Sequence, residues 1–158
     1  MRCSSEFSSI ALNSIDGLPA VNSLLPVRLL PGDDLRAALS AAVAAAGAQA
    51  AFVVAGIGSL GPAVLRLAGA EQVRVIDGDV EILTLAGTLA ANGEHLHMSV
   101  ADASGRVHGG HVGNGCVVRT TAEVLVQLLP DWTFSREPDA LTGYDELVVR
   151  AKPSGHEL

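Results

Sequence analysis

Four of the five histidines lie within one segment, "HLHMSVADASGRVHGGHV", residues 95–112. Imidazole nitrogens are common protein ligands of Zn²⁺ and of other divalent ions. On an extended strand, residues i and i+2 share one face, so His95 and His97 project together while Leu96 and Met98 point to the other side. The spacing therefore indicates two metal ligands on a strand whose opposite face is apolar.

A tight turn is expected directly after this strand. The three-residue loop 103–105, with Gly105 in the left-handed conformation, is a common hairpin geometry. Such a loop pairs Asp102 with Arg106 and fixes the register between the strand before the loop and the strand after it. A slip of one residue would move every side chain to the other face.

This register brings a third histidine to the pair. His97 falls opposite His111, and His95 lies diagonal to His111 on the same face, whereas His108 does not converge with them. Opposed Cβ atoms lie about 5 Å apart, so ring nitrogens can meet one ion at the roughly 2.0–2.1 Å typical of zinc. Ordinary solvated or hydrogen-bonded histidines on a sheet surface are the alternative interpretation.

We therefore predict that His95, His97 and His111 bind a divalent metal, with zinc favoured. Three histidines leave a fourth position for water, substrate or a carboxylate, as in catalytic zinc sites. The fifth histidine, His156, lies in the polar tail "KPSGHEL" and is expected to be only solvated.

Two other charged residues are candidates for supporting roles. Glu81, in "GDVEILTL", is either an exposed strand residue or an acid near the metal that anchors a ligand histidine. Arg66 is either a solvated charge or the partner of such a carboxylate. Ser59 lacks a G-x-S-x-G elbow, and "GIGSLGPA" matches neither a dinucleotide fingerprint nor a P-loop, so no catalytic or nucleotide-cofactor residues are assigned.

The sequence pattern of residues 26–60 predicts a strand, a helix and a second strand. Asp33 or Asp34 can cap a helix that runs to about Ala46, where Gly47 ends it. Apolar residues recur on one face of that helix at helical spacing, and these are Leu35, Leu39 and Val43.

Strands outnumber helices in the remainder of the chain. Asp77-Gly78 favours a tight turn and predicts that the two β runs around it pair as a hairpin. Further strands are expected at 95–101, 106–112, 116–128 and 144–150. The fold class is therefore α+β, a single domain with a mostly antiparallel sheet and one main Ala-rich helix.

Composition limits the function further. The 158 residues carry a formal net charge of −7, which disfavours unaided binding to nucleic acid. Cys3 and Cys116 are too far apart in sequence to indicate a zinc ribbon or a disulfide framework. No segment has the length and apolarity of a membrane span, and no signal peptide is evident, so we expect a cytoplasmic protein without membrane contact.

Six segments together resemble the plants-and-prokaryotes-conserved (PPC) domain family, of the stand-alone prokaryotic type. They are "RLLPGDDL", "GIGSL", "GDVEILTLAGTL", "HLHMSVADASGRVHGGHVGNGCVV", "TTAEV" and "TGYDELVV", and they span about residues 28–150. The resemblance implies a strongly bent antiparallel sheet with an acetolactate-decarboxylase-like architecture. On this basis residues 1–25 are an N-terminal extension, 26–151 the PPC-like domain and 152–158 a polar tail.

The resemblance also implies a homotrimer and, in prokaryotic members, a metal on the positions of His95, His97 and His111. Family members are often labelled DNA-binding, but this chain lacks the Arg-Gly-Arg-Pro core of an AT-hook, which enters the minor groove. Our first hypothesis is a trimeric metal-binding module with a regulatory or interaction role. We assign it no enzymatic activity, and this role allows for a protein partner. The alternatives are a small-molecule metalloenzyme with a three-histidine zinc site and a direct DNA-binding protein.

Overall fold

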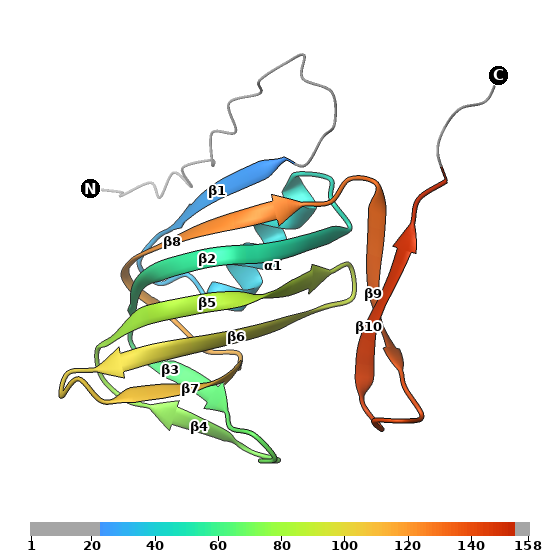
Figure 1. Ribbon diagram of the computed structural model, residues 1–158. Coiled ribbons are helices and arrows are strands. Elements are labelled where there is room, and N and C mark those ends of the chain that lie inside the picture. Colours follow the sequence, from blue (N-terminus) through green and yellow to red (C-terminus); the bar gives the residue numbers. More distant parts are fainter. Residues whose placement is uncertain (1–22, 154–158) are drawn as a thin grey trace, which may run out of the picture.

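The computed structural model describes residues 23–153, which form one large sheet, one helix and a separate hairpin (Figure 1). The elements in chain order are β1 (Leu24–Leu29), α1 (Leu35–Ala45), β2 (Ala50–Leu60), β3 (Ala63–Arg66), β4 (Val73–Ile76), β5 (Val80–Ala90), β6 (Gly93–Asp102), β7 (Val107–Val112), β8 (Val118–Leu128), β9 (Trp132–Pro138) and β10 (Asp145–Ala151). β1 begins within the expected N-terminal extension, of which residues 1–22 lie outside the described residues.

The large sheet has eight strands in the order β1-β8-β2-β5-β6-β7-β3-β4. All of its neighbouring strands are antiparallel. Its register shifts between Val53 and Ala55 in β2 and between Ile82 and Thr84 in β5, and such bulges bend and twist a sheet. The α+β class, with a mostly antiparallel sheet, is confirmed.

Helix α1 begins and ends where the sequence predicts. The Asp34 carboxylate accepts a hydrogen bond from the Ala37 backbone N–H at 3.0 Å, which satisfies one of the free donors of the first turn. Gly47 follows the helix with a φ of +70°, a left-handed conformation that favours glycine. The apolar residues at helical spacing, Leu35, Leu39 and Val43, are all buried.

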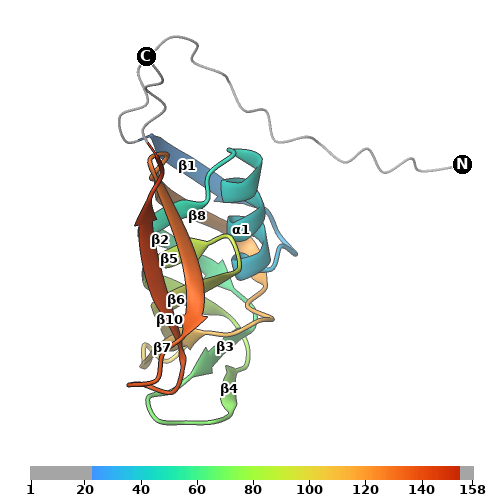
Figure 2. The same cartoon turned by 90° about the vertical axis from the view of Figure 1, so that its right-hand side faces the viewer.

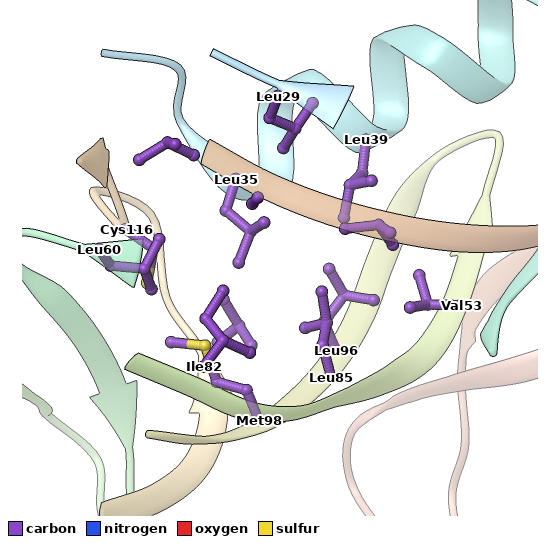
Figure 3. Close-up of a cluster of buried hydrophobic side chains, with 14 of the residues drawn as sticks. Leu29, Leu35, Leu39, Val53, Leu60, Ile82, Leu85, Leu96, Met98 and Cys116 are labelled. Atoms are coloured by element: carbon purple, nitrogen blue, oxygen red, sulfur yellow. The ribbon is translucent and has the colours of Figure 1, made fainter. Parts of the chain in front are cut away.

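The hydrophobic core fills the space between α1 and one face of the sheet, which we call the inner face (Figure 3). On β6, Leu96 and Met98 enter this core, whereas His97 is exposed on the opposite, outer face. The core also holds the free Cys116, whose thiol donates to the Val64 carbonyl at 3.3 Å. The largest side chains with the least exposure are Leu35, Leu39, Leu60, Leu65, Leu85 and Leu96.

The β9–β10 hairpin stands across the ends of the long strands, on the side away from the N-terminus of the helix (Figure 2). Phe134 of β9 packs edge-to-face against Phe52 of β2, with ring centroids 5.5 Å apart. The segment 132–138 was not expected to be a strand. Its pairing with the expected C-terminal strand gives the molecule a second, two-stranded sheet.

The hairpin predicted around Asp77-Gly78 is wrong. The chain does turn there, and Gly78 has a φ of +86°, but β4 pairs with β3 and not with β5. Both edges of β5 are already occupied by β2 and β6, so no edge remains for β4. Within residues 23–153 no helix is long and apolar enough to cross a bilayer.

Candidate metal centre

The turn between β6 and β7 has the geometry that the sequence predicts. The Asp102 N–H donates to the Arg106 carbonyl at 2.9 Å, and Gly105, with a φ of +78°, donates to the Asp102 carbonyl at 2.8 Å. The Asp102 carboxylate also accepts hydrogen bonds from Ser104 and from the Arg106 N–H. Together with His108, these donors hold the pKa of Asp102 well below its usual range, so the carboxylate stays charged and the turn is closed.

This turn sets the predicted register on the two strands. His97 lies opposite His111, and Val100 lies opposite His108. His95, two residues before His97, joins them on the outer face. His108 instead bonds the Asp102 carboxylate at 2.9 Å and stays apart from the other three, as expected.

Three ring nitrogens meet at one point. The Nε2 atom of His95 lies 2.9 Å from Nδ1 of His111, and Nε2 of His97 lies 3.0 Å from each of them. Nitrogens that bind one ion at roughly 2.0–2.1 Å lie at most about 4 Å apart. The three distances therefore satisfy the requirement for a shared metal ion.

These three contacts cannot all be hydrogen bonds. An imidazole nitrogen either carries a proton or presents a lone pair. Among three nitrogens, at least two must be in the same state, so at least one contact sets two donors or two lone pairs against each other. A cation removes this conflict because all three nitrogens can then present lone pairs to it.

The surroundings keep two of the rings neutral. Burial is the largest cause that lowers the pKa of His95, and the charge of Arg136 is the next. Burial likewise lowers the pKa of His111, followed by the charge of Arg66. Neutral imidazole is the form that binds metals, so the site favours the ligating state near pH 7.

Arg66 reaches the site through the pairing of β3 with β7, which places it opposite His111. A Cβ added at Gly110 would lie 2.6 Å from the Arg66 carbonyl oxygen, so only glycine lets these strands approach so closely. Of the two alternatives for Arg66, the carboxylate partner is not found among the described residues. Its guanidinium makes only a long bond, 3.4 Å, to the Ala70 carbonyl.

Glu81 does not support the metal site. It lies on β5 five residues before Ala86, the residue opposite His97. Because a strand rises about 3.3–3.4 Å per residue, this separation is roughly 17 Å. Glu81 is an exposed strand residue, and His156 lies outside the described residues.

An ion pair that sequence reasoning missed braces the two histidine strands. Arg36 of α1 binds the Glu94 carboxylate at 2.7 Å and donates to the Val112 carbonyl at 2.9 Å. Ser40 donates to the same carboxylate at 3.2 Å. Glu94 and Val112 are the immediate neighbours of two of the histidines, so the helix fixes the ends of β6 and β7 relative to each other.

Arg136 was also missed, because it lies on the unexpected strand β9. Its Nη2 atom donates to the Thr88 hydroxyl at 2.6 Å, and Thr88 lies opposite His95 in the β5–β6 pairing. The alternating apolar pattern around it, Trp132 and Phe134, was the sequence signal that could have identified this strand.

A cavity of about 1070 Å³ opens beside the histidines, between the sheet and the β9–β10 hairpin. His95 and His111 line it, so a molecule in the cavity can reach the site. Three arginines that are scattered in sequence gather on its wall, and they are Arg36, Arg66 and Arg136.

The Plants and Prokaryotes Conserved (PCC) domain model matches residues 20–130 of this sequence. The bifunctional protein GlmU of Synechococcus sp. (strain JA-2-3B'a(2-13)) is 42% identical over 132 residues, which cover 84% of this chain and 21% of that protein. The chain thus spans about a fifth of the length of the curated relatives that it matches.

Two solved structures are similar throughout. A hypothetical protein from Salmonella enterica is 40% identical with a TM-score of 0.81, and the match covers 86% of this chain and 99% of that one. A metal-containing protein from Archaeoglobus fulgidus is 25% identical with a TM-score of 0.71, over 80% of this chain and 93% of that one.

Proposed function

The chain belongs to the Plants and Prokaryotes Conserved domain family, and from this premise we propose that it is a trimeric metal-binding module with a regulatory or interaction role. The observation that carries the metal part of the proposal is the triangle of imidazole nitrogens, 2.9–3.0 Å apart, on β6 and β7. A similar structure whose name describes it as metal-containing agrees with this proposal.

Nε2 of His95, Nε2 of His97 and Nδ1 of His111 would hold the ion. All three ligands are neutral nitrogens, a donor set that suits zinc and other late divalent metals better than magnesium or calcium. A bound zinc ion supplies Lewis acidity and, in a structural role, stabilises the fold. The β6–β7 turn and the Arg36–Glu94 ion pair hold the ligands in place before the ion arrives.

The outer face of the sheet supports the assembly part of the proposal. Ile57, Val54 and Leu83 are exposed there by 58%, 53% and 48%, and Phe52 by 42%. Several large apolar side chains exposed on one face of a sheet are typical of a surface that binds another protein. A homotrimer that buries this face between neighbouring sheets accounts for it.

Metal analysis tests the site directly. Purified wild-type protein should hold close to one zinc ion per chain after exposure to zinc and removal of excess metal. His97→Ala should reduce the metal content at least tenfold, because two imidazoles remain. His108→Ala removes a histidine outside the cluster and should leave the metal content unchanged, because the Asp102 carboxylate keeps its bonds to Ser104 and to the Arg106 N–H. Equal, near-zero metal in the wild type and His97→Ala would refute the metal proposal.

Sedimentation equilibrium tests the assembly. The wild type should have three times the mass of one chain, and Ile57→Glu should shift the protein toward monomers because it places a charge in an apolar interface. Val73→Glu, which changes an exposed valine on the edge strand β4, is the matched control. A wild type that sediments as a monomer would refute the trimer.

One observation favours a second candidate, a small-molecule metalloenzyme: the cavity beside His95 and His111 gives a substrate access to the ion. The activity of the GlmU relatives does not decide the matter, because the chain covers only about a fifth of their length. Direct DNA binding is the weakest candidate. The net charge of −7 opposes it, and the arginines on the cavity wall are interspersed with carboxylates.

A further inference from the structure

Two arginines on the cavity wall have no carboxylate partner among residues 23–153. Arg66 makes only the 3.4 Å bond to the Ala70 carbonyl. Arg136 donates from Nη2 to Thr88, and its Nε atom is buried without any hydrogen-bond partner in the described part of the chain. A buried guanidinium nitrogen without an acceptor is costly, so the hydrogen-bonding capacity of Arg136 is not satisfied by the described residues.

Arg36, the third arginine that lines the cavity, differs from these two because it has an ion-pair partner. Arg36 is fully engaged by the Glu94 carboxylate and the Val112 carbonyl, and it braces the fold. Arg66 and Arg136 have no ion pair of this kind among the described residues. They flank the histidines from different elements, because Arg66 lies opposite His111 and Arg136 binds the residue opposite His95.

A guanidinium group is a planar fork of donors that matches the two oxygens of a carboxylate or phosphate. Two such groups beside a metal site make an anion subsite rather than a site for a neutral or cationic molecule. The cavity volume of about 1070 Å³ accommodates a small molecule and remains open to solvent.

The net charge of the residues that line the cavity indicates which charge a bound anion should carry. Its three arginines face four carboxylates, and these are Glu71, Glu94, Asp145 and Glu146. With neutral histidines the wall therefore carries one net negative charge, and a divalent ion on the histidines would change this to one net positive charge. A singly charged anion balances that site, whereas a dianion would leave excess negative charge in it.

We propose that this cavity is the binding site for a small organic monocarboxylate, held by Arg66 and Arg136 beside the three histidines. The inference rests on the proposed metal function, because the ion supplies the charge that makes the wall positive. Metal and carboxylate therefore strengthen each other's binding, as thermodynamic linkage requires.

Calorimetric titration tests the subsite with acetate, glycolate and inorganic phosphate as probes, in low-salt buffer. Each protein sample is first assayed for zinc, so that metal binding and anion binding are read separately. We expect acetate and glycolate to bind the zinc-loaded wild type, and to bind at least about tenfold more weakly after EDTA treatment or in Arg66→Met. Arg106→Met, which removes an exposed arginine at the β6–β7 turn, is the matched control and should bind like the wild type.

Arg136→Met is the second variant that removes a guanidinium group from the proposed site. Arg66→Lys keeps the positive charge and removes the guanidinium group, so it tests whether the planar donor geometry or only the charge is needed. We expect Arg66→Lys to bind acetate with an affinity between those of the wild type and Arg66→Met. Equal acetate affinities for zinc-loaded Arg66→Met and Arg106→Met would overturn the subsite while leaving the metal proposal intact, and so would phosphate binding more tightly than acetate. A wild type that retains no zinc would overturn both proposals.

Discussion

The two faces of the large sheet differ in what their side chains achieve. On the inner face, Leu96 is only 2% exposed and packs into the core beneath α1. On the outer face the next residue, His97, is exposed and lies 3.0 Å from two other imidazoles. Because the core supplies the stability, the outer face can hold a cluster of imidazoles that contributes little to folding when no metal is bound. The comparison indicates that stability and function occupy opposite sides of the same strands.

The strongest test of this difference between the two faces substitutes Leu96 and His97, which are adjacent on β6. Leu96→Ala should lower the free energy of unfolding by about 2–5 kcal/mol, because it removes buried methyl groups and leaves a cavity. His97→Ala should change the stability of the metal-free protein by less than about 0.5 kcal/mol, as is usual for an exposed side chain. Urea denaturation in the presence of EDTA measures both. Similar losses for the two variants would contradict the division.

A second test compares two adjacent glycines of β7. A Cβ at Gly110 points to the inner side and would lie 2.6 Å from the Arg66 carbonyl oxygen, so the strands must separate. We expect Gly110→Ala to lower the free energy of unfolding by about 1–3 kcal/mol. A Cβ at Gly109 lies 3.4 Å from its nearest neighbour, the Met98 carbonyl oxygen, which is ordinary contact. Thermal unfolding should therefore show little change for Gly109→Ala, and equal shifts of Tm would refute the argument.

The smallest effect concerns protonation of the metal-free cluster. Burial lowers the pKa values of His95 and His111 in the folded state below their ordinary value of 6.5. The unfolded chain therefore binds more protons just below pH 6.5, so stability should fall as the pH decreases from 7 toward 5. His95→Gln should show a shallower decrease when unfolding is measured with EDTA over this range. A slope unchanged by the substitution would show that His95 does not titrate in this way.

Local sequence signals predicted much of the candidate site. The cap at Asp34 located the helix, and the Asp102–Gly105 turn fixed the register that opposes His97 and His111. Both predictions depend on interactions between residues that are close in sequence. The bond geometry of a short turn leaves few alternatives, so the histidine register follows from counting residues.

Features that depend on distant segments could not be predicted in the same way. β4 pairs with β3 because β2 and β6 occupy β5, a fact about strand order that the Asp77-Gly78 turn does not encode. The residue type and the strand face of Glu81 favour a place near the site, but its position along β5 places it too far away. Arg136 reaches the site from a strand some forty residues later in the chain, and only the folded hairpin brings it there.

The three-residue reversal between β6 and β7 also restricts how this protein can evolve. Inserting one residue there would turn His111 toward the helix side and bring a neighbouring apolar or glycine residue to the ligand position. Deleting one residue would do the same. Homologues that retain all three imidazoles should therefore keep the separation of 14 residues between the second and the third, even where the identities of the loop residues drift.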